Sequence, residues 1–242
     1  MYDNLFCRVY NEFGWNEYPR VFGEALIQWL AIHGADVHTA LDLGCGTGVL
    51  CEALSARGID TLGVDLSEDM IAVASARAPG LRYRVGNMVT LETERRFDLV
   101  TCTGDALNHV TDIEDIRRVF RNVHRALNPG GLFVFDLLRA DEVPLGEPFE
   151  APLSDRLTVR FSAARDAEGF TTLLIDGYED GALSFSEIIR ERLYDIHMIC
   201  DLLRAEGFEI LQCADRLLPD GGSRGTTWFV IARSENDIRQ RS

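Results

Sequence analysis

The first 138 positions of the chain alternate between short apolar runs and segments in which apolar residues recur at helical spacing. The spacing predicts helices over 18–33 and near 48–57, 67–77 and 112–127. The apolar runs have the length of strands and lie at 39–43, 61–65, 81–85, 97–102 and 131–138. Continuous apolar strands that alternate with helices predict a parallel sheet covered on both faces. The segment Asn128-Pro129-Gly130-Gly131 predicts a helix stop and a turn before the fifth strand.

The pattern changes after residue 138. Residues 139–154 are rich in acids and prolines, and the chain then alternates apolar and polar positions, with turn residues between the runs. This is typical of antiparallel hairpins. A helix near 195–206 and strands at 208–213 and 226–232 follow. We therefore expect a Rossmann-like, doubly wound α/β sheet with a small antiparallel insert after its fifth strand. The expected parts are an N-terminal aromatic lid and helix (1–37), the core (38–138), the insert (139–194), the completion of the core (195–233) and a tail (234–242).

The segment Leu41-Asp42-Leu43-Gly44-Cys45-Gly46-Thr47-Gly48 ends the first strand and opens a helix. Glycines there let the backbone turn tightly and approach a ligand. A dinucleotide site would have G-x-G-x-x-G, but here the third glycine falls one position early. Asp42 would repel a pyrophosphate, and it suits a ligand that carries an ammonium and a sulfonium. Asp65 ends the second strand, where an acid can accept hydrogen bonds from both ribose hydroxyls.

These residues resemble the glycine-rich motif of the class I S-adenosylmethionine (SAM)-dependent methyltransferases. The resemblance is strong over residues 38–138 and looser over 195–233. GVDLSEDMIAVA is similar to the family's next strand and helix, FDLVTCTGDALNHV to its fourth strand and loop, and LNPGGLFVFDLL to its fifth strand. The resemblance implies SAM as cofactor, S-adenosylhomocysteine as product, and a seven-stranded sheet of order 3-2-1-4-5-7-6 with strand seven antiparallel.

The resemblance also assigns cofactor contacts. Gly44, Cys45, Gly46 and Gly48 would hold the methionine part beside Asp42, and Asp65 would bind the ribose. The adenine would lie between Leu66, Met70, Asn87 and Met88. Asn87 stands where the family more often has Asp, although its side chain can still hydrogen-bond the exocyclic amine. Cys102 and Thr103, just past strand four, would line the cofactor on its substrate side.

The N-terminal segment 2–20 is unusually aromatic. Small-molecule members of the family often lay such a segment over the cofactor, with a tyrosine near the sulfonium. A cation beside an aromatic face is favoured by about 0.5–2 kcal/mol. We expect Tyr10 first and Trp15 second in this position, while rings that only pack the lid onto the domain are an equally open interpretation.

The loop after strand four lies at the carboxyl end of the sheet, where open α/β sheets bind ligands. Asp105 and His109 are candidate catalytic residues together with Tyr10, and Asn108 is a candidate substrate contact. The alternatives are that Asp105 caps a turn and that His109 is an exposed loop residue. On the insert, Tyr178, Glu187, Arg190 and Arg192 lie on strands that could roof the site, or they could simply form a solvated face.

The amino-acid composition excludes several classes of reaction and partner. The 39 acids and 24 bases give a net charge of −15, and every base is arginine. Without lysine, the chain can form neither a P-loop nor a Schiff base. The acid excess argues against a polyanionic partner, because nucleic-acid affinity comes largely from basic side chains that displace phosphate counterions. Neither a Pro-Cys pair nor an Asn/Asp-Pro-Pro-aromatic motif is present, which also points away from DNA bases.

The cysteines and histidines do not form metal-binding motifs. The six cysteines include no C-x-x-C pair, and the five histidines no H-x-x-x-H, so we expect reduced thiols and no metal site. The N-terminus lacks the charged and apolar regions of a signal peptide, and no apolar run approaches 18 residues. The expectation is a soluble cytoplasmic protein, either a monomer or a homodimer.

Taken together, the sequence predicts a SAM-dependent methyltransferase that transfers a methyl group to a small-molecule acceptor by in-line displacement, with N or O as the nucleophile. The insert resembles that of glycine and nucleotide-sugar N-methyltransferases, where it closes over a small acceptor. Two alternatives stay open: methylation of a protein or RNA, and a catalytically silent SAM-binding regulatory protein. A nicotinamide-dependent oxidoreductase is a more distant alternative.

Overall fold

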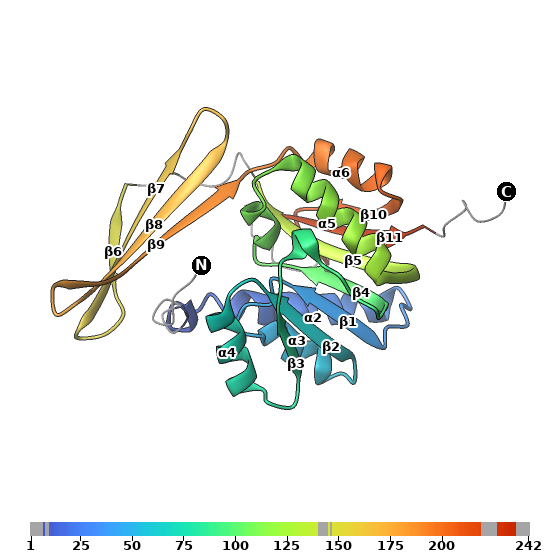
Figure 1. Ribbon diagram of the computed structural model, residues 1–242, viewed down its shortest axis with the longest axis horizontal. Helices are drawn as coiled ribbons and strands as arrows, with labels where there is room; N and C mark the ends of the chain where they lie inside the picture. The colour runs from blue at the N-terminus through green and yellow to red at the C-terminus, as the bar shows by residue number, and fades with distance from the viewer. Residues whose placement is uncertain (1–6, 8–9, 140–144, 146, 219–226, 236–242) are drawn as a thin grey trace.

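The structure is a computed structural model, which describes residues 7, 10–139, 145, 147–218 and 227–235. These residues form one large sheet flanked by helices and a second, smaller antiparallel sheet that projects from one end of it (Figure 1). The strands are β1 (Thr39–Leu43), β2 (Asp60–Asp65), β3 (Arg82–Val85), β4 (Phe97–Cys102), β5 (Leu127–Leu138), β6 (Phe149–Pro152), β7 (Leu157–Arg165), β8 (Phe170–Glu179), β9 (Ala182–Arg192), β10 (Phe208–Ala214) and β11 (Thr227–Ser234). The helices are α2 (Glu17–Ile32), α3 (Val49–Ser55), α4 (Glu68–Arg77), α5 (Ile113–Ala126) and α6 (Ile196–Ala205), with short 3₁₀ turns η1 (Met88–Thr90) and η2 (Ala106–His109).

The large sheet has seven strands in the order β10-β11-β5-β4-β1-β2-β3. Strands β1 to β5 pair in parallel, whereas β11 is antiparallel to both β5 and β10. Counted along the chain without the insert, this is the expected order 3-2-1-4-5-7-6 with an antiparallel seventh strand. The predicted fold class is therefore confirmed. Such an order reverses direction between β1 and β4, which places a crevice at the carboxyl ends of these strands.

Local sequence explains the helices that cover the sheet, and α5 is the clearest example. Its buried positions, Ile116, Val119, Phe120, Val123 and Ala126, recur every three or four residues and so form one apolar face. The carboxylate of Asp112 accepts a hydrogen bond from the backbone N–H of Glu114 and caps the first turn. Helix α5 therefore packs its apolar face on the sheet and leaves its charged face to solvent.

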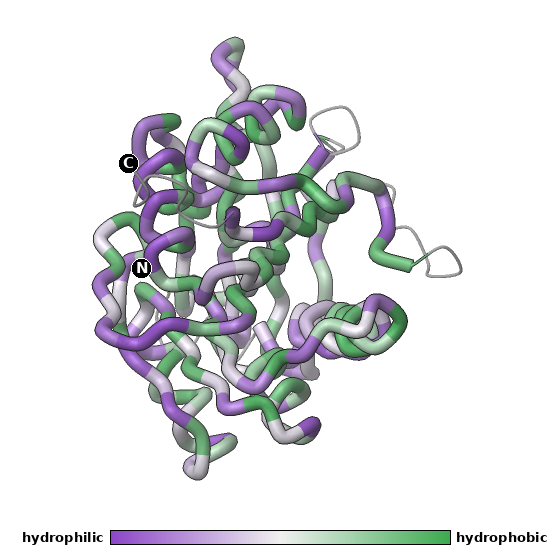
Figure 2. The backbone as a smooth tube through the Cα atoms, turned by 90° about the vertical axis from the view of Figure 1, so that its right-hand side faces the viewer, coloured by the Kyte–Doolittle hydropathy of each residue, from purple (hydrophilic) through white to green (hydrophobic). Residues whose placement is uncertain are grey.

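Two hydrophobic clusters lie on opposite faces of the large sheet. One gathers α5 and α6 with side chains from β1, β4, β5 and β11, including Phe120, Phe133 and Phe208. The other gathers α2 and α3 with the alternate side chains of the same strands, including Trp29, Leu50 and Phe229. The strands can be followed in Figure 2, where hydrophobic residues are green. Burial on both faces explains why these strands are continuous apolar runs in the sequence.

The second sheet has the order β6-β7-β8-β9, and all its pairs are antiparallel. A third hydrophobic cluster joins one face of this sheet to the N-terminal segment and to α4. Phe13 stacks on Trp15 with ring centroids 5.2 Å apart, and both rings contact Phe161 of β7 edge-on. The N-terminal segment therefore fastens the insert to the core, across the carboxyl end of the large sheet.

One expectation about local structure is corrected. The segment Asn128–Gly131 is not a turn between a helix and a strand, because β5 begins at Leu127, directly after α5. Phe97 pairs with Leu127 while Leu99 pairs with Leu132, so the extra residues form an irregularity within the strand. Pro129 and Gly130 are accommodated there because a bulge needs neither a full ladder of N–H donors nor a negative φ at every position.

None of the helices in the described part of the chain combines the length and apolar character needed to cross a membrane.

Candidate active site

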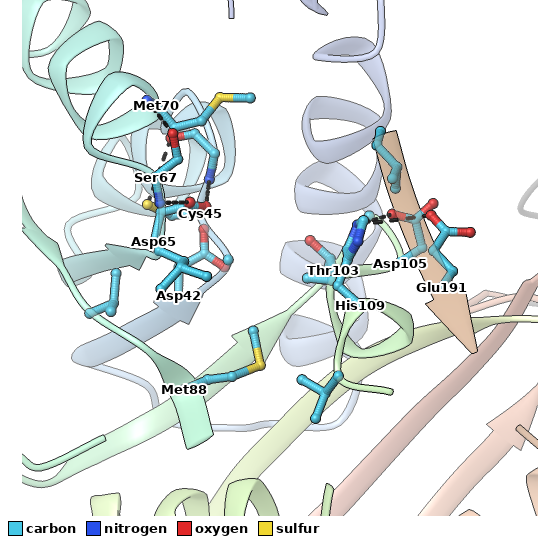
Figure 3. A pocket seen from close by; sticks show the side chains of 18 of the residues that line it. Asp42, Cys45, Asp65, Ser67, Met70, Met88, Thr103, Asp105, His109 and Glu191 are labelled. Atoms are coloured by element: carbon cyan, nitrogen blue, oxygen red, sulfur yellow. Dashed lines mark hydrogen bonds and ion pairs between the residues drawn. The ribbon is translucent and has the colours of Figure 1, made fainter. Parts of the chain in front are cut away.

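A cavity of about 680 Å³ opens at the carboxyl ends of β1, β2 and β4. Its floor is the large sheet, and its roof is formed by the N-terminal segment and strand β9 of the insert. Figure 3 shows two groups of side chains on opposite sides of this pocket. Asp42, Cys45, Asp65 and Ser67 lie on one side, and Asp105, His109 and Glu191 on the other. We call these the cofactor end and the acceptor end, after the roles that the sequence resemblance predicts for them.

The turn from β1 into α3 depends on glycine at the cofactor end. Gly44 has a φ of +68°, and a Cβ there would lie only 2.7 Å from the Cβ of Ala106. Gly46 has a φ of +51°, and no atom lies within 4 Å of the position its Cβ would take. Because Gly46 lines the cavity, this open space is available to a ligand that approaches the backbone closely.

Asp42 lies beside the cavity and is almost fully buried, with 2% of its surface exposed. Its carboxylate accepts hydrogen bonds from the hydroxyl of Thr101, at 2.7 Å, and from the thiol of Cys51, at 3.5 Å. Burial raises the pKa of Asp42 to about 7, although both hydrogen bonds oppose the shift. A buried acid of this kind is stabilised in its charged form by a cation, which is the ligand charge that the sequence predicts here.

Asp65 is held in position by the glycine turn itself. Its carboxylate accepts hydrogen bonds from the backbone N–H groups of Gly46 and Ser67, each at 2.8 Å. Burial raises its pKa, and these backbone donors partly offset the effect. The two acids at the ends of β1 and β2 are thus fixed relative to each other by the turn between them.

The residues expected around an adenine also line the cofactor end: Leu66, Met70, Asn87 and Met88. Leu66 leaves 58% of its surface exposed, which is unusual for a leucine in a cavity wall. Met70 is buried on α4, and the amide oxygen of Asn87 accepts a hydrogen bond from the N–H of Val89. An aromatic ring placed between these side chains would cover the exposed apolar surface.

Both aromatic residues singled out in the N-terminal segment line the cavity. The rings of Tyr10 and Trp15 meet edge-on with centroids 5.5 Å apart. Trp15 also packs against Phe161 of the insert, so it is both a wall of the cavity and part of the cluster that fastens the roof.

The loop after β4 brings Asp105 to the acceptor end in a strained conformation. Gly104 and Asp105 both have positive φ values, 71° and 56°, and the latter is rare for a residue with a side chain. The buried carboxylate of Asp136 on β5 holds this loop, because it accepts hydrogen bonds from the N–H groups of Gly104, at 3.0 Å, and Asp105, at 2.9 Å. The hydroxyl of Tyr18 on α2 donates to the same carboxylate.

His109 faces two carboxylates at the acceptor end. Its Nε2 atom lies 3.8 Å from Oδ1 of Asp105 and 3.9 Å from Oε1 of Glu191. His109 keeps 33% of its side chain exposed, and the desolvation of the rest lowers its pKa to about 4, while burial raises the pKa of Glu191 to about 7. Both groups are therefore disfavoured in their charged forms unless a partner of opposite charge is present.

Most of the residues singled out from the sequence line the cavity, including Thr103, Glu187 and Arg190. Five do not belong to its described lining: Gly48, Cys102, Asn108, Tyr178 and Arg192, whose guanidinium donates to the carbonyl of Thr111. Gly48 caps α3, and Cys102 is fully buried in the core. The amide of Asn108 is also fully buried, where it donates to the carbonyl of Arg192 and accepts from the N–H of Leu138. Asn108 thus joins the core to the insert, which leaves its amide turned to the backbone rather than to a substrate.

Sequence reasoning missed three residues of the site. Glu191 follows Phe185, Glu187 and Ile189 at a spacing of two, so alternation along β9 places it on the inward face. This alternation would have predicted Glu191 as a site residue from the sequence. Tyr18 and Asp136 lie 118 positions apart, and nothing local in the sequence connects them.

The geometry of the cofactor end fits SAM. The open space at Gly46 admits close approach to the backbone, the buried Asp42 favours a cation, and the exposed Leu66 offers an apolar surface. Asp65 would accept hydrogen bonds from ribose hydroxyls. Each of these features matches one part of the molecule.

Comparisons with known proteins agree with this geometry. The family model described as a methyltransferase domain matches residues 40–131. A protein named as a methyltransferase in Geobacillus sp. (strain WCH70) is 29% identical over 183 residues, which are 71% of this chain and 74% of the relative. The dTDP-4-amino-2,3,4,6-tetradeoxy-D-glucose N,N-dimethyltransferase of Saccharopolyspora spinosa is 30% identical over 111 residues, about half of each chain (46% and 45%). The crystal structure of a SAM-dependent methyltransferase from Clostridium acetobutylicum ATCC 824 has a TM-score of 0.83 at 25% identity and covers 96% of this chain and 99% of that one.

A seven-stranded sheet of this order, with an acid at the end of each of its first two strands around a glycine turn, defines a class I SAM-binding fold. The family match lies on the same strands and turn. Residues 40–131 match a methyltransferase domain, and together with the fold this match makes the chain a SAM-dependent enzyme with SAM as its cofactor.

Proposed function

We propose that this enzyme methylates a small molecule at a nitrogen or oxygen atom, in the acceptor end of the cavity. The observation that carries the proposal is that the acceptor end of the cavity is covered. Strand β9 and the N-terminal segment cover the acceptor end, and both are tied down through the aromatic contacts of Trp15 with Phe161. A cavity of about 680 Å³ lies within the range of about 300–1,000 Å³ that is usual for small-molecule sites.

When bound, SAM supplies a methyl group to the acceptor's lone pair, and the electron pair of the broken carbon–sulfur bond stays with sulfur. The protein's part is to orient the two reactants, exclude water and take up a proton. Asp42 would pair with the ammonium of the cofactor and Asp65 would bind its ribose, while Thr103, Tyr10 and Trp15 would line its substrate side. His109 would accept the acceptor's proton at Nε2, stabilised by Asp105.

The relative from Saccharopolyspora spinosa is named for an amino sugar as substrate, which supports a small acceptor and a nitrogen nucleophile. This relative is 30% identical over about half of each chain. At that similarity it supports a class of acceptor and does not identify a particular molecule. We also propose that the enzyme acts in the cytoplasm, in keeping with the free thiols of Cys45, Cys51, Cys102, Cys200 and Cys213.

The test is methyl transfer from labelled SAM to a cell extract that has been divided into a low-molecular-mass ultrafiltrate, a protein fraction and an RNA fraction. We expect label in the ultrafiltrate, and we expect Asp65→Ala to abolish it. Label in the protein or RNA fraction that protease or nuclease removes would replace the proposal with a macromolecular acceptor. Binding of SAM without transfer to any fraction would indicate a regulatory protein.

A further inference from the structure

The charged groups at the acceptor end are strongly unbalanced. Besides Asp42 and Asp65, five carboxylates line the cavity in the described part of the chain: Asp105 beside η2, Asp112 and Asp115 at the start of α5, and Glu187 and Glu191 on β9. The lining groups that can carry a positive charge there are Arg190 and the imidazole of His109. The hydroxyl-bearing side chains of Tyr10 and Tyr18 also line the cavity.

Arg190 is directed away from the inward face of β9. Residues alternate along a strand, and the inward face of β9 carries the buried Glu187 and Ile189 together with Glu191, which is less exposed than Arg190. Arg190 belongs to the other face, and its guanidinium lies over the ring of Phe170, 4.3 Å from the centroid. Arg190 is the one arginine among the described lining residues. Its cation–π contact holds the guanidinium away from the carboxylates of the cavity.

Two of the five carboxylates lie on or next to helix α5. Asp112 caps α5, and Asp115 forms an ion pair with Arg118 at 2.6 Å. The remaining three, Asp105, Glu187 and Glu191, come from both the core and the insert. Nε2 of His109 lies 3.8 Å and 3.9 Å from the carboxylates of Asp105 and Glu191. A cationic group that entered beside His109 would be within reach of two acids, one from the loop after β4 and one from the insert.

We propose, building on the proposed function, that the acceptor is a small amine that is cationic in solution and carries no phosphate, bound through its ammonium between Asp105 and Glu191 and deprotonated by His109. The ammonium gives one proton to Nε2 of His109. The freed lone pair then forms the bond to the methyl carbon of SAM, whose carbon–sulfur bond breaks with its electron pair going to sulfur. The products are the methylated ammonium and S-adenosylhomocysteine, and the proton on His109 leaves to solvent.

A phosphorylated acceptor does not suit this end of the cavity. Phosphate recognition depends on arginine forks, lysine or helix N-termini that point at the anion. Here the phosphate would face carboxylates, and like charges a few ångströms apart repel strongly in a partly buried site. The acceptor class therefore differs from the diphosphate-linked sugar named for the Saccharopolyspora spinosa relative, while the amine is shared.

The experiment separates a metabolite extract at neutral pH into cationic, neutral and anionic pools by ion exchange. Each pool is incubated with the enzyme and isotopically labelled SAM, and products are detected by mass spectrometry. We expect labelled products from the cationic pool. Label from the neutral or anionic pool alone would overturn the amine proposal but leave the small-molecule function standing. No label in any of the three pools would overturn both.

The assignment of Glu191 is tested by substitution. Glu191→Gln keeps the size of the side chain and removes its charge, so we expect the rate with the cationic pool to fall about tenfold to a hundredfold. The affinity for S-adenosylhomocysteine, measured by calorimetry, should change by less than about twofold, because Glu191 lies at the other end of the cavity. Glu168→Gln, in the exposed turn between β7 and β8, is the matched control.

Asp105→Asn provides the second variant in case Glu191→Gln alters the fold. A rate that is unchanged in both variants, with S-adenosylhomocysteine binding intact, would overturn the carboxylate site. If Glu191→Gln loses S-adenosylhomocysteine binding but Asp105→Asn does not, the rate of Asp105→Asn decides. An unchanged rate in Asp105→Asn would then overturn the carboxylate site.

Discussion

Glu191 of the antiparallel insert and His109 of the methyltransferase core meet across the cavity, with 3.9 Å between Oε1 and Nε2. Glu191 lies on strand β9 of the insert and His109 on the turn η2 of the core, so their relative position depends on how the insert docks. That docking rests on the aromatic contacts of the N-terminal segment and on the amide of Asn108, which bridges Arg192 and Leu138. The acceptor end is therefore assembled by packing far from the reacting atoms.

His109→Gln should lower the rate of methyl transfer by about a hundredfold or more, because general bases contribute about 10²–10⁴-fold. The affinity for S-adenosylhomocysteine should stay within about twofold of the native value. The measurement combines labelled methyl transfer with calorimetry. His124→Gln, in the last turn of α5 and outside the described lining of the cavity, serves as the control. A native rate in His109→Gln would remove His109 from the mechanism.

Asp65→Ala should weaken binding of S-adenosylhomocysteine by at least about tenfold, since hydrogen bonds to a charged group are worth about 1.5–3 kcal/mol. Asp60→Ala is a matched control on the same strand, because Asp60 lies at its outer end and pairs with Arg82 and Arg95. Calorimetric titration of both variants checks the prediction. Equal affinities in the two variants would contradict the role given to Asp65.

Binding of S-adenosylhomocysteine should strengthen as the pH rises from 6 to 8. The pKa of Asp42 is raised to about 7 by burial, so at pH 6 most molecules must lose a proton from Asp42 before the ligand's ammonium can pair with it. For a single group of this pKa the gain in affinity is about tenfold. Titrations across this range should show the slope in the native protein and a flat profile in Asp42→Asn.

The same carboxyl group should destabilise the ligand-free fold at alkaline pH. The folded pKa of Asp42 is higher than that of an unfolded aspartate, so the folded state binds more protons, and stability falls as the pH rises from about 4 through about 7. Asp42→Asn should therefore raise the free energy of unfolding at pH 8 by about 1–3 kcal/mol, because a tenfold change in proton affinity between the folded and unfolded states corresponds to about 1.4 kcal/mol. Urea denaturation at pH 5 and pH 8 tests this, and the gain should be smaller at pH 5.

Asp136→Ala should destabilise the fold more than Tyr18→Phe. The first removes the acceptor of two buried backbone N–H groups, at Gly104 and Asp105, and an unsatisfied buried donor costs about 1–3 kcal/mol. The second removes one hydroxyl donor and leaves both backbone bonds in place. Urea unfolding curves for the two variants rank them, and a larger loss in Tyr18→Phe would contradict the arrangement.

The cofactor end could be predicted from the sequence because its residues are local. Asp42, Gly44 and Gly46 are neighbours on one turn, and Asp65 ends the next strand, so spacing alone places them together. The acceptor end could be predicted only in part. Asp105 and His109 lie on one loop, whereas Glu191 reaches them through the docking of two sheets. Asp136 reaches the loop only because β5 pairs with β4. Contacts of this kind depend on the tertiary arrangement and leave no periodic pattern in the sequence.

The described lining residues of the cavity fall into two stretches of the chain, 10–115 and 173–191. The first carries every group assigned to the cofactor, and the second belongs wholly to the insert between β5 and α6. Under the proposed function, Asp105 and His109 of the acceptor end come from the core, whereas Glu187 and Glu191 come from one contiguous segment of the insert. Exchange of residues 173–191 would therefore change the surroundings of the acceptor and leave every group assigned to the cofactor in place.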